Sequence, residues 1–84
     1  MLTALTAEDI RYARNVDLQK LTGIHASNFA AWSNNRHISE RNLGAIAQAL
    51  GMEKSEVLRG FELRRKDNQT TAKITERIEA LIAP

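Results

Sequence analysis

The sequence has no cysteine and no long apolar run, and both absences exclude classes of protein. Without cysteine, the 84-residue chain can form neither a disulfide framework nor a thiolate metal site. Its apolar runs are far shorter than the roughly 20 residues that a membrane-spanning helix requires. The first ten residues lack the basic start and apolar centre of a secretion signal, so we interpret Leu2 and Leu5 as core residues. We therefore expect a soluble cytoplasmic protein.

Aromatic residues are few, and neither sign of charge dominates. With only four aromatic side chains, a core must consist mainly of Leu, Ile, Val and Ala, and a hydrophobic content of 43% is enough for one small domain. Twelve basic and ten acidic side chains leave a net charge of +2, although the pI near 9.4 leans toward polyanionic partners. We expect a single domain without a second one that would hold a small-molecule effector, and we expect no cofactor.

The chain is organised around residues 17–35, whose pattern is typical of two short helices joined by a glycine corner. Leu18 and Leu21 form an apolar pair with helical spacing, and Phe29 and Trp32 form a second pair. Gly23 stands between the pairs, and glycine adopts the left-handed backbone conformation without the roughly 1–2 kcal/mol that a β-carbon adds. The pattern predicts helices over residues 18–22 and 26–33, which is the shape of a helix-turn-helix.

Polar residues predict where the first helices begin and end. Thr6 is a suitable cap for a helix over residues 7–14, and Asp17 can cap the helix that ends at Gly23. Asn34 and Asn35 are predicted to close the helix over residues 26–33, because Asn is the best residue after glycine for the left-handed conformation that ends helices.

Two more helices follow from the apolar spacing. Ser39 is a good cap for a helix that Gly51 ends, and a clear stripe runs through it at Leu43, Ile46, Ala47 and Leu50. Residues 53–63 are predicted to form the next helix, in which Gly60 is the weak point because glycine disfavours a helix interior. Its apolar residues are Val57, Leu58 and Phe61.

A polar stretch, residues 64–70, is predicted to separate this body from a last amphipathic helix over residues 71–83. A helix of about a dozen residues is marginal alone in water, so its apolar stripe must be covered. The helix could fold back on its own body or pair with a second copy. The stripe consists of Ile74, Ile78, Leu81 and Ile82.

Residues 18–58 resemble the lambda-repressor-like (Cro/CI, XRE-type) helix-turn-helix family. The resemblance implies an all-α fold with a five-helix DNA-binding domain over residues 1–65, followed by the linker and additional C-terminal helix over residues 66–84. Gln19 departs from the family pattern, which prefers a small residue where the two helices approach closely. The residues that carry the resemblance are Leu18, Thr22-Gly23-Ile24, Ser27-Asn28-Phe29, Trp32, Asn34, Leu43, Ile46-Ala47, Ala49-Leu50-Gly51 and Glu56-Val57-Leu58.

The resemblance implies a sequence-specific transcription regulator, similar to a small phage or bacterial repressor, whose third helix enters the major groove of double-stranded DNA. Asn and Ser can both donate to and accept from base edges, and alanine methyl groups can pack against thymine. The implied base contacts are His25, Ala26, Ser27, Asn28 and Ala31. The implied phosphate contacts are Asn34, Asn35, Arg36, His37 and Arg41.

A readout surface of alanines, one Ser and one Asn discriminates poorly as a monomer, because each good bidentate contact supplies only about 1–3 kcal/mol. Two copies that read half-sites about 34 Å apart would roughly double the discrimination. We therefore expect a homodimer held by Ile74, Ile78, Leu81 and Ile82.

Several of the residues named above also allow a structural interpretation. Trp32 is three residues from Phe29 and is expected in the core rather than on a base. His25 and His37 lack a nearby cysteine or acidic cluster, so neither a metal site nor an enzyme is expected. The basic run over residues 64–66 is interpreted as an ordinary solvated helix end. The rival function is a protein-interaction module on the same fold, with the alanine-rich third helix as its docking face. An antitoxin-like protein would combine both functions, because it would bind DNA at one end and another protein through its C-terminal helix.

Overall fold

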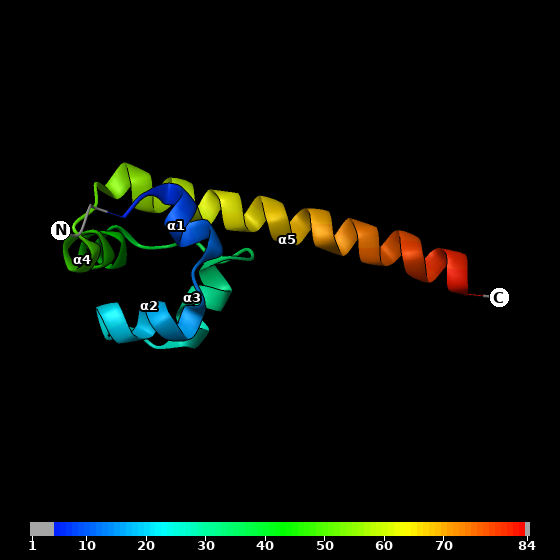
Figure 1. Ribbon diagram of the computed structural model, residues 1–84, viewed down its shortest axis with the longest axis horizontal. Helices are drawn as coiled ribbons and strands as arrows, with labels where there is room; N and C mark the ends of the chain where they lie inside the picture. Colours follow the sequence, from blue (N-terminus) through cyan, green and yellow to red (C-terminus); the bar gives the residue numbers. More distant parts are fainter. Residues whose placement is uncertain (1–4, 84) are drawn as a thin grey trace.

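The computed structural model describes residues 5–83 and contains helices and no strands over that range, which confirms the all-α part of the predicted fold class. The expected role of Leu2 in the core lies outside the described residues, whereas Leu5 packs against the core. Figure 1 shows α5 along one side of the molecule, with α1 crossing it and α2 and α3 on the far side of α1. The five helices are α1 (Ala7–Tyr12), α2 (Asn15–Thr22), α3 (Ala26–Trp32), α4 (Glu40–Leu50) and α5 (Lys54–Ile82).

Three aromatic rings form the centre of the core. The rings of Phe29 and Trp32 on α3 meet edge to face at 5.5 Å between centroids, and Phe29 stacks on Phe61 of α5 at 6.1 Å. Such pairs contribute roughly 0.5–1.5 kcal/mol beyond their buried area. Aliphatic side chains complete the cluster, as expected from the composition. They are Ile10, Leu18, Ile38, Leu43, Ile46, Ala47, Leu50 and Val57.

Helix α1 lies directly on α5 at Gly60. A β-carbon built at Gly60 would come within 2.6 Å of Ile10 Cβ and 3.2 Å of the Ala7 carbonyl oxygen. The missing side chain is therefore what allows the two helices to approach. The sequence interpretation of Gly60 as a weak point in a helix is incomplete, because the glycine is required by packing.

Local capping explains the helix ends that were predicted correctly. The Asp9 carboxylate accepts from the Thr6 amide at 2.8 Å at the start of α1, and Ser39 Oγ accepts from the Asn42 amide at 3.2 Å at the start of α4. Gly23 and Gly51 end α2 and α4 with φ of 77° and 66°, in the left-handed region.

Other predicted ends are wrong. Helix α1 stops at Tyr12 instead of residue 14, and α2 begins three residues early, at Asn15. Asp17 is inside α2 and pairs with Arg14 at 2.9 Å instead of capping the helix. The helix over residues 26–33 ends without a left-handed Asn, because no residue other than glycine has positive φ between residues 5 and 83.

The predicted break over residues 64–70 is also wrong, because α5 is one continuous helix of 29 residues. Its first half packs on the other helices, and its second half projects from the body (Figure 1). Every residue from 68 to 83 is exposed, so the helix does not fold back on its own body. The predicted apolar stripe is thus carried away from the core on an extended arm.

Candidate nucleic-acid interface

The first turn of α3 is closed by side chains of the protein itself. His25 Nδ1 accepts from the Ser27 amide at 3.1 Å and lies 2.8 Å from Ser27 Oγ. Gln19 Oε1 on α2 accepts from the Ala26 amide at 2.8 Å. Because Nδ1 accepts a hydrogen bond, the proton of a neutral His25 ring belongs on Nε2. The Ala26 and Ser27 amides are thus already paired within the protein, and the groups that this turn offers to a ligand are side chains.

Helix α3 turns its rings inward and its small polar groups outward. Phe29 and Trp32 are 0% and 2% exposed, which confirms their predicted place in the core. Ser27 and Ala30 are exposed. The remaining predicted base contacts differ in exposure: His25 is exposed, whereas Ala26, Asn28 and Ala31 are partly buried. The outward face of α3 therefore carries short side chains, which include the hydroxyl group of Ser27 and the amide group of Asn28.

Arg36 joins this face from the segment that follows α3. Its Nη1 lies 3.5 Å from Asn28 Oδ1, at the outer limit of a hydrogen bond. The segment is held in place because Ile38 is buried in the core and Arg65 of α5 donates to the Trp32 and Arg36 carbonyl oxygens at 2.8 and 2.9 Å. One predicted phosphate contact thus lies beside one predicted base contact.

The other predicted phosphate contacts are exposed, but they are not equivalent. Asn35 and His37 lie in the segment after α3, and Arg41 is in the first turn of α4. Asn34 is engaged within the protein, because its Nδ2 donates to the Ala30 carbonyl oxygen at 2.9 Å and its Oδ1 accepts from Asn68 at 3.3 Å. Asn34 therefore offers less to a ligand than the sequence suggested.

The charge distribution singles out this part of the chain. Residues 18–39, which include α3 and most of α2, contain no Asp or Glu, although the whole chain has ten. The same residues include Lys20, Arg36 and both histidines. The outward side of α3 therefore presents no carboxylate of its own that would repel a polyanion.

Arg64 fixes the position of α3 from its buried side. It is 7% exposed, and its guanidinium donates to the Ile10 carbonyl oxygen and to Asn15 Oδ1, both at 2.6 Å. It also donates to Ser33 Oγ at 3.1 Å and to the Ala13 carbonyl oxygen. Burial lowers the pKa of Arg64 from its ordinary value. This one side chain ties α5 to the ends of α1 and α3 and to the start of α2.

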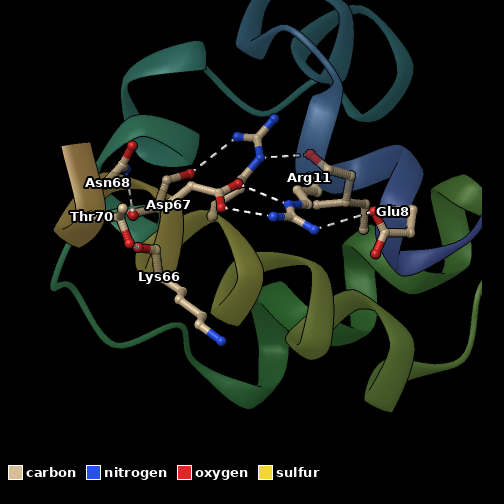
Figure 2. A network of polar contacts seen from close by, with 9 residues as sticks. Glu8, Arg11, Lys66, Asp67, Asn68 and Thr70 are labelled. Carbon is tan, nitrogen blue, oxygen red and sulfur yellow. Dashed lines mark hydrogen bonds and ion pairs between the residues drawn. The ribbon is translucent and has the colours of Figure 1, made fainter.

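An ion pair on the surface supports the same junction (Figure 2). Arg11 on α1 donates to both carboxylate oxygens of Asp67 on α5, each at 2.9 Å, and Glu8 Oε2 lies 3.5 Å from the same guanidinium. Hydrogen bonds from Arg11 lower the pKa of Asp67. Asn68 Nδ2 adds a bond to the Ser33 carbonyl oxygen at 2.8 Å.

The predictions from the sequence do not include this junction. The interpretation of residues 64–66 as a solvated helix end is wrong for Arg64 and Arg65, whose guanidinium groups donate to distant backbone oxygens. A usable signal was present, since Arg64 is three residues from the buried Phe61 and so lies on the same side of a helix. Its partners could not be identified, because they are 31 to 54 residues away in sequence.

The predicted dimerisation residues lie on the projecting half of α5. Ile74, Ile78, Leu81 and Ile82 are 50%, 51%, 87% and 76% exposed. Large apolar side chains at such exposure are unusual in a contiguous row and mark surfaces that other molecules cover.

The remaining chemistry of the described residues is limited. Between residues 5 and 83 no three His, Cys, Asp or Glu side chains are arranged to hold a metal ion. None of the helices described there has the length and apolar character needed to cross a membrane. Comparisons of the chain with protein-family models, curated proteins and solved structures give no match.

Proposed function

We propose that the protein is a sequence-specific DNA-binding regulator of transcription. In this proposal α2, Gly23 and α3 act as a helix-turn-helix, and α3 enters the major groove. The observation that carries the proposal is the division of α3 into two sides, with Phe29 and Trp32 buried while Ser27 and Ala30 are exposed. The resemblance of residues 18–58 to the lambda-repressor-like family implies the same function.

The size and chemistry of the exposed side favour DNA. The major groove is about 12 Å wide and admits an α-helix whose outward side chains are short. Asn28 can pair with adenine through its amide, Ser27 can donate or accept, and the Ala30 and Ala31 methyl groups can contact thymine. The neutral His25 ring retains an Nε2 donor for a base edge or a phosphate.

The basic residues around α3 favour a phosphate backbone on either side of the groove. Arg36, His37 and Arg41 are exposed, and no carboxylate lies within residues 18–39. Each phosphate neutralised by such a residue releases counterions, so affinity falls with salt by a log–log slope of about −0.9 per contact. The Asn28–Arg36 contact also links base recognition to backbone positioning.

The alternative role of α3 as a protein-docking face receives less support. The large apolar side chains that are exposed between residues 5 and 83 lie on α1, α2 and α5, and none is on α3. Protein interfaces are usually centred on such side chains, with aromatic residues enriched among them. A surface of alanine, serine and asparagine suits a hydrated, polar groove better than a partner protein.

Selection from a randomised duplex library tests the proposal and supplies a binding sequence. With that duplex, Arg36→Ala should weaken binding to all sequences about equally and reduce the salt slope by about 1, because it removes a phosphate contact. Asn28→Ala should instead relax preference at one base position, with the other positions unchanged. Each variant should keep the circular dichroism spectrum of the parent protein.

Two outcomes would contradict the proposal. One is a library from which no sequence is enriched over its starting frequency at low salt. The other is an Asn28→Ala variant that loses the same affinity on every duplex, because a base contact must distinguish sequences.

A further inference from the structure

One face of α5 runs without interruption from the body to the tip. Leu63 and Leu81 are five helical turns apart at about 3.6 residues per turn, so they lie on the same side. The residues between them follow one another at spacings of three or four, and Asp67 is the only charged residue in this row, with Arg77 at its edge. They are Asp67, Thr70, Ile74 and Ile78.

Two shallow hollows follow each other along this face. The first lies at the body, where Tyr12 of α1 and Leu63 are surrounded by polar and charged side chains, namely Arg11, Lys66, Asp67, Thr70 and Thr71. The second lies toward the tip and is lined by Ile74, Arg77, Ile78 and Leu81. Tyr12 is 72% exposed and Leu81 is 87% exposed, so both ends of the face present a large side chain to solvent. Both ends are therefore accessible to a binding partner.

We propose that a second copy of this chain covers this face. The two α5 helices pack antiparallel, so that Leu81 of each copy lies against Tyr12 and Leu63 of the other. The contact is isologous, because each copy contributes the same tip and accepts it in the same hollow. The inference goes beyond DNA binding and does not depend on it, because the surfaces involved are on α1 and α5.

Charge selects the antiparallel direction. A parallel pair in register would place Asp67 opposite the partner's Asp67 on the contact face, and like charges across an interface are unfavourable. When Leu81 lies opposite the partner's Leu63, the centre of the antiparallel contact is at the level of residue 72 along the helix. Asp67 and Arg77 are equally far from this centre, on opposite sides of it. Arg77 of each copy therefore lies opposite the partner's Asp67, whose carboxylate can accept from it in addition to Arg11.

The register of the two α5 helices is selected by charge and by the exposed side chains that each register would cover. A pair centred on Ile78 would bring Arg77 beside the partner's Arg77 and would leave Tyr12 and Leu63 exposed. The proposed register instead sets Ile74 against the partner's Thr70 near the two-fold axis and covers both hollows. Residues 71–83 carry two basic and two acidic side chains, so the arms have no net charge that would keep two copies apart.

Sedimentation in the absence of DNA tests the association separately from the proposed function. The parent protein should sediment as a dimer that dissociates on dilution. Leu81→Lys should raise the dissociation constant of the dimer at least tenfold, because it replaces the apolar contact with Tyr12 and Leu63 by an ammonium group near the Arg11 and Lys66 that line the hollow at the body. The matched control is Ala72→Lys, which adds the same side chain on the opposite side of α5 and should leave the dimer unchanged. Circular dichroism should show the same helix content in all three proteins.

Cross-linking tests the direction and the register. Because the chain has no cysteine, Tyr12→Cys and Leu81→Cys variants each carry one thiol. A short bismaleimide should link the two variants when they are mixed, and should link neither variant to itself. A parent protein that remains monomeric at all soluble concentrations would overturn the proposal. So would Leu81→Cys that links to itself, or a mixture that gives no link between the two variants.

Discussion

The buried guanidinium of Arg64 holds the ends of α1 and α3 and the start of α2 at a single point on α5. It satisfies backbone carbonyl oxygens at Ile10 and Ala13 that would otherwise be buried without a donor. Its planar fork reaches several acceptors at once, which a lysine ammonium at the same position could not do. The residue is structural, and its effect on DNA binding is indirect.

Replacing this group should cost much of the stability of the protein. Arg64→Met keeps the length of the aliphatic stem but leaves several acceptors unpaired, each at a cost of about 1–3 kcal/mol. We expect the free energy of unfolding to fall by roughly 3 kcal/mol or more, against a typical total of about 5–15 kcal/mol. Urea denaturation followed by Trp32 fluorescence measures the change, because Trp32 is the only tryptophan and is buried.

The matched control is Arg59→Met, which removes an exposed guanidinium from the same helix. Surface substitutions of this kind usually change stability by less than about 0.5 kcal/mol. Equal losses from Arg64→Met and Arg59→Met would show that the four hydrogen-bonded partners of Arg64 contribute nothing specific to the fold.

Among the elements, α4 could be predicted in full and α5 only in part. The start, stripe and end of α4 are all set by nearby residues, from the Ser39 cap to Gly51. In α5, the polar residues 64–70 resemble a linker in the sequence, yet Arg64, Arg65 and Asp67 bond to other elements and continue the helix. The pattern of neighbouring residues cannot show whether a polar side chain faces solvent or bonds to a segment that is distant in the sequence.

The crossing of α1 over α5 gives a prediction at the scale of elements. Gly60→Ala improves helix propensity by up to about 1 kcal/mol. Its β-carbon would meet Ile10 at 2.6 Å, however, so α1 must shift, and overpacking of this kind costs about 1–3 kcal/mol. We expect a lower thermal midpoint, measured by circular dichroism.

Gly44→Ala is the control, because Gly44 also lies inside a helix but its added β-carbon meets only the flexible Lys54 side chain, at 3.4 Å. We expect this variant to be stabilised by about 0.5–1 kcal/mol. A rise in midpoint for Gly60→Ala equal to that for Gly44→Ala would contradict the close contact between α1 and α5.

At the scale of the whole molecule, the structure combines a small helical body with an arm formed by the second half of α5. The sequence predicted the inward side of α3 and the apolar stripe on the arm, because both depend on spacing within one helix. It did not predict that Gln19 closes the first turn of α3 or that Asn34 bonds to Asn68, because both contacts depend on how separate elements meet. The body supplies the proposed DNA-binding face, and the arm supplies the proposed contact with a second copy.

The central claim, that the outward side of α3 binds DNA, is tested most directly by one pair of alanine substitutions. Ala30 on α3 and Ala49 on α4 are both exposed, so each accepts a longer side chain without disturbing the core. Anisotropy of a labelled duplex, titrated at several salt concentrations, should give at least tenfold weaker binding for Ala30→Glu, because a carboxylate would face the groove. Ala49→Glu should bind as the parent protein does. Equal affinity of Ala30→Glu and the parent protein at every salt concentration would contradict the claim.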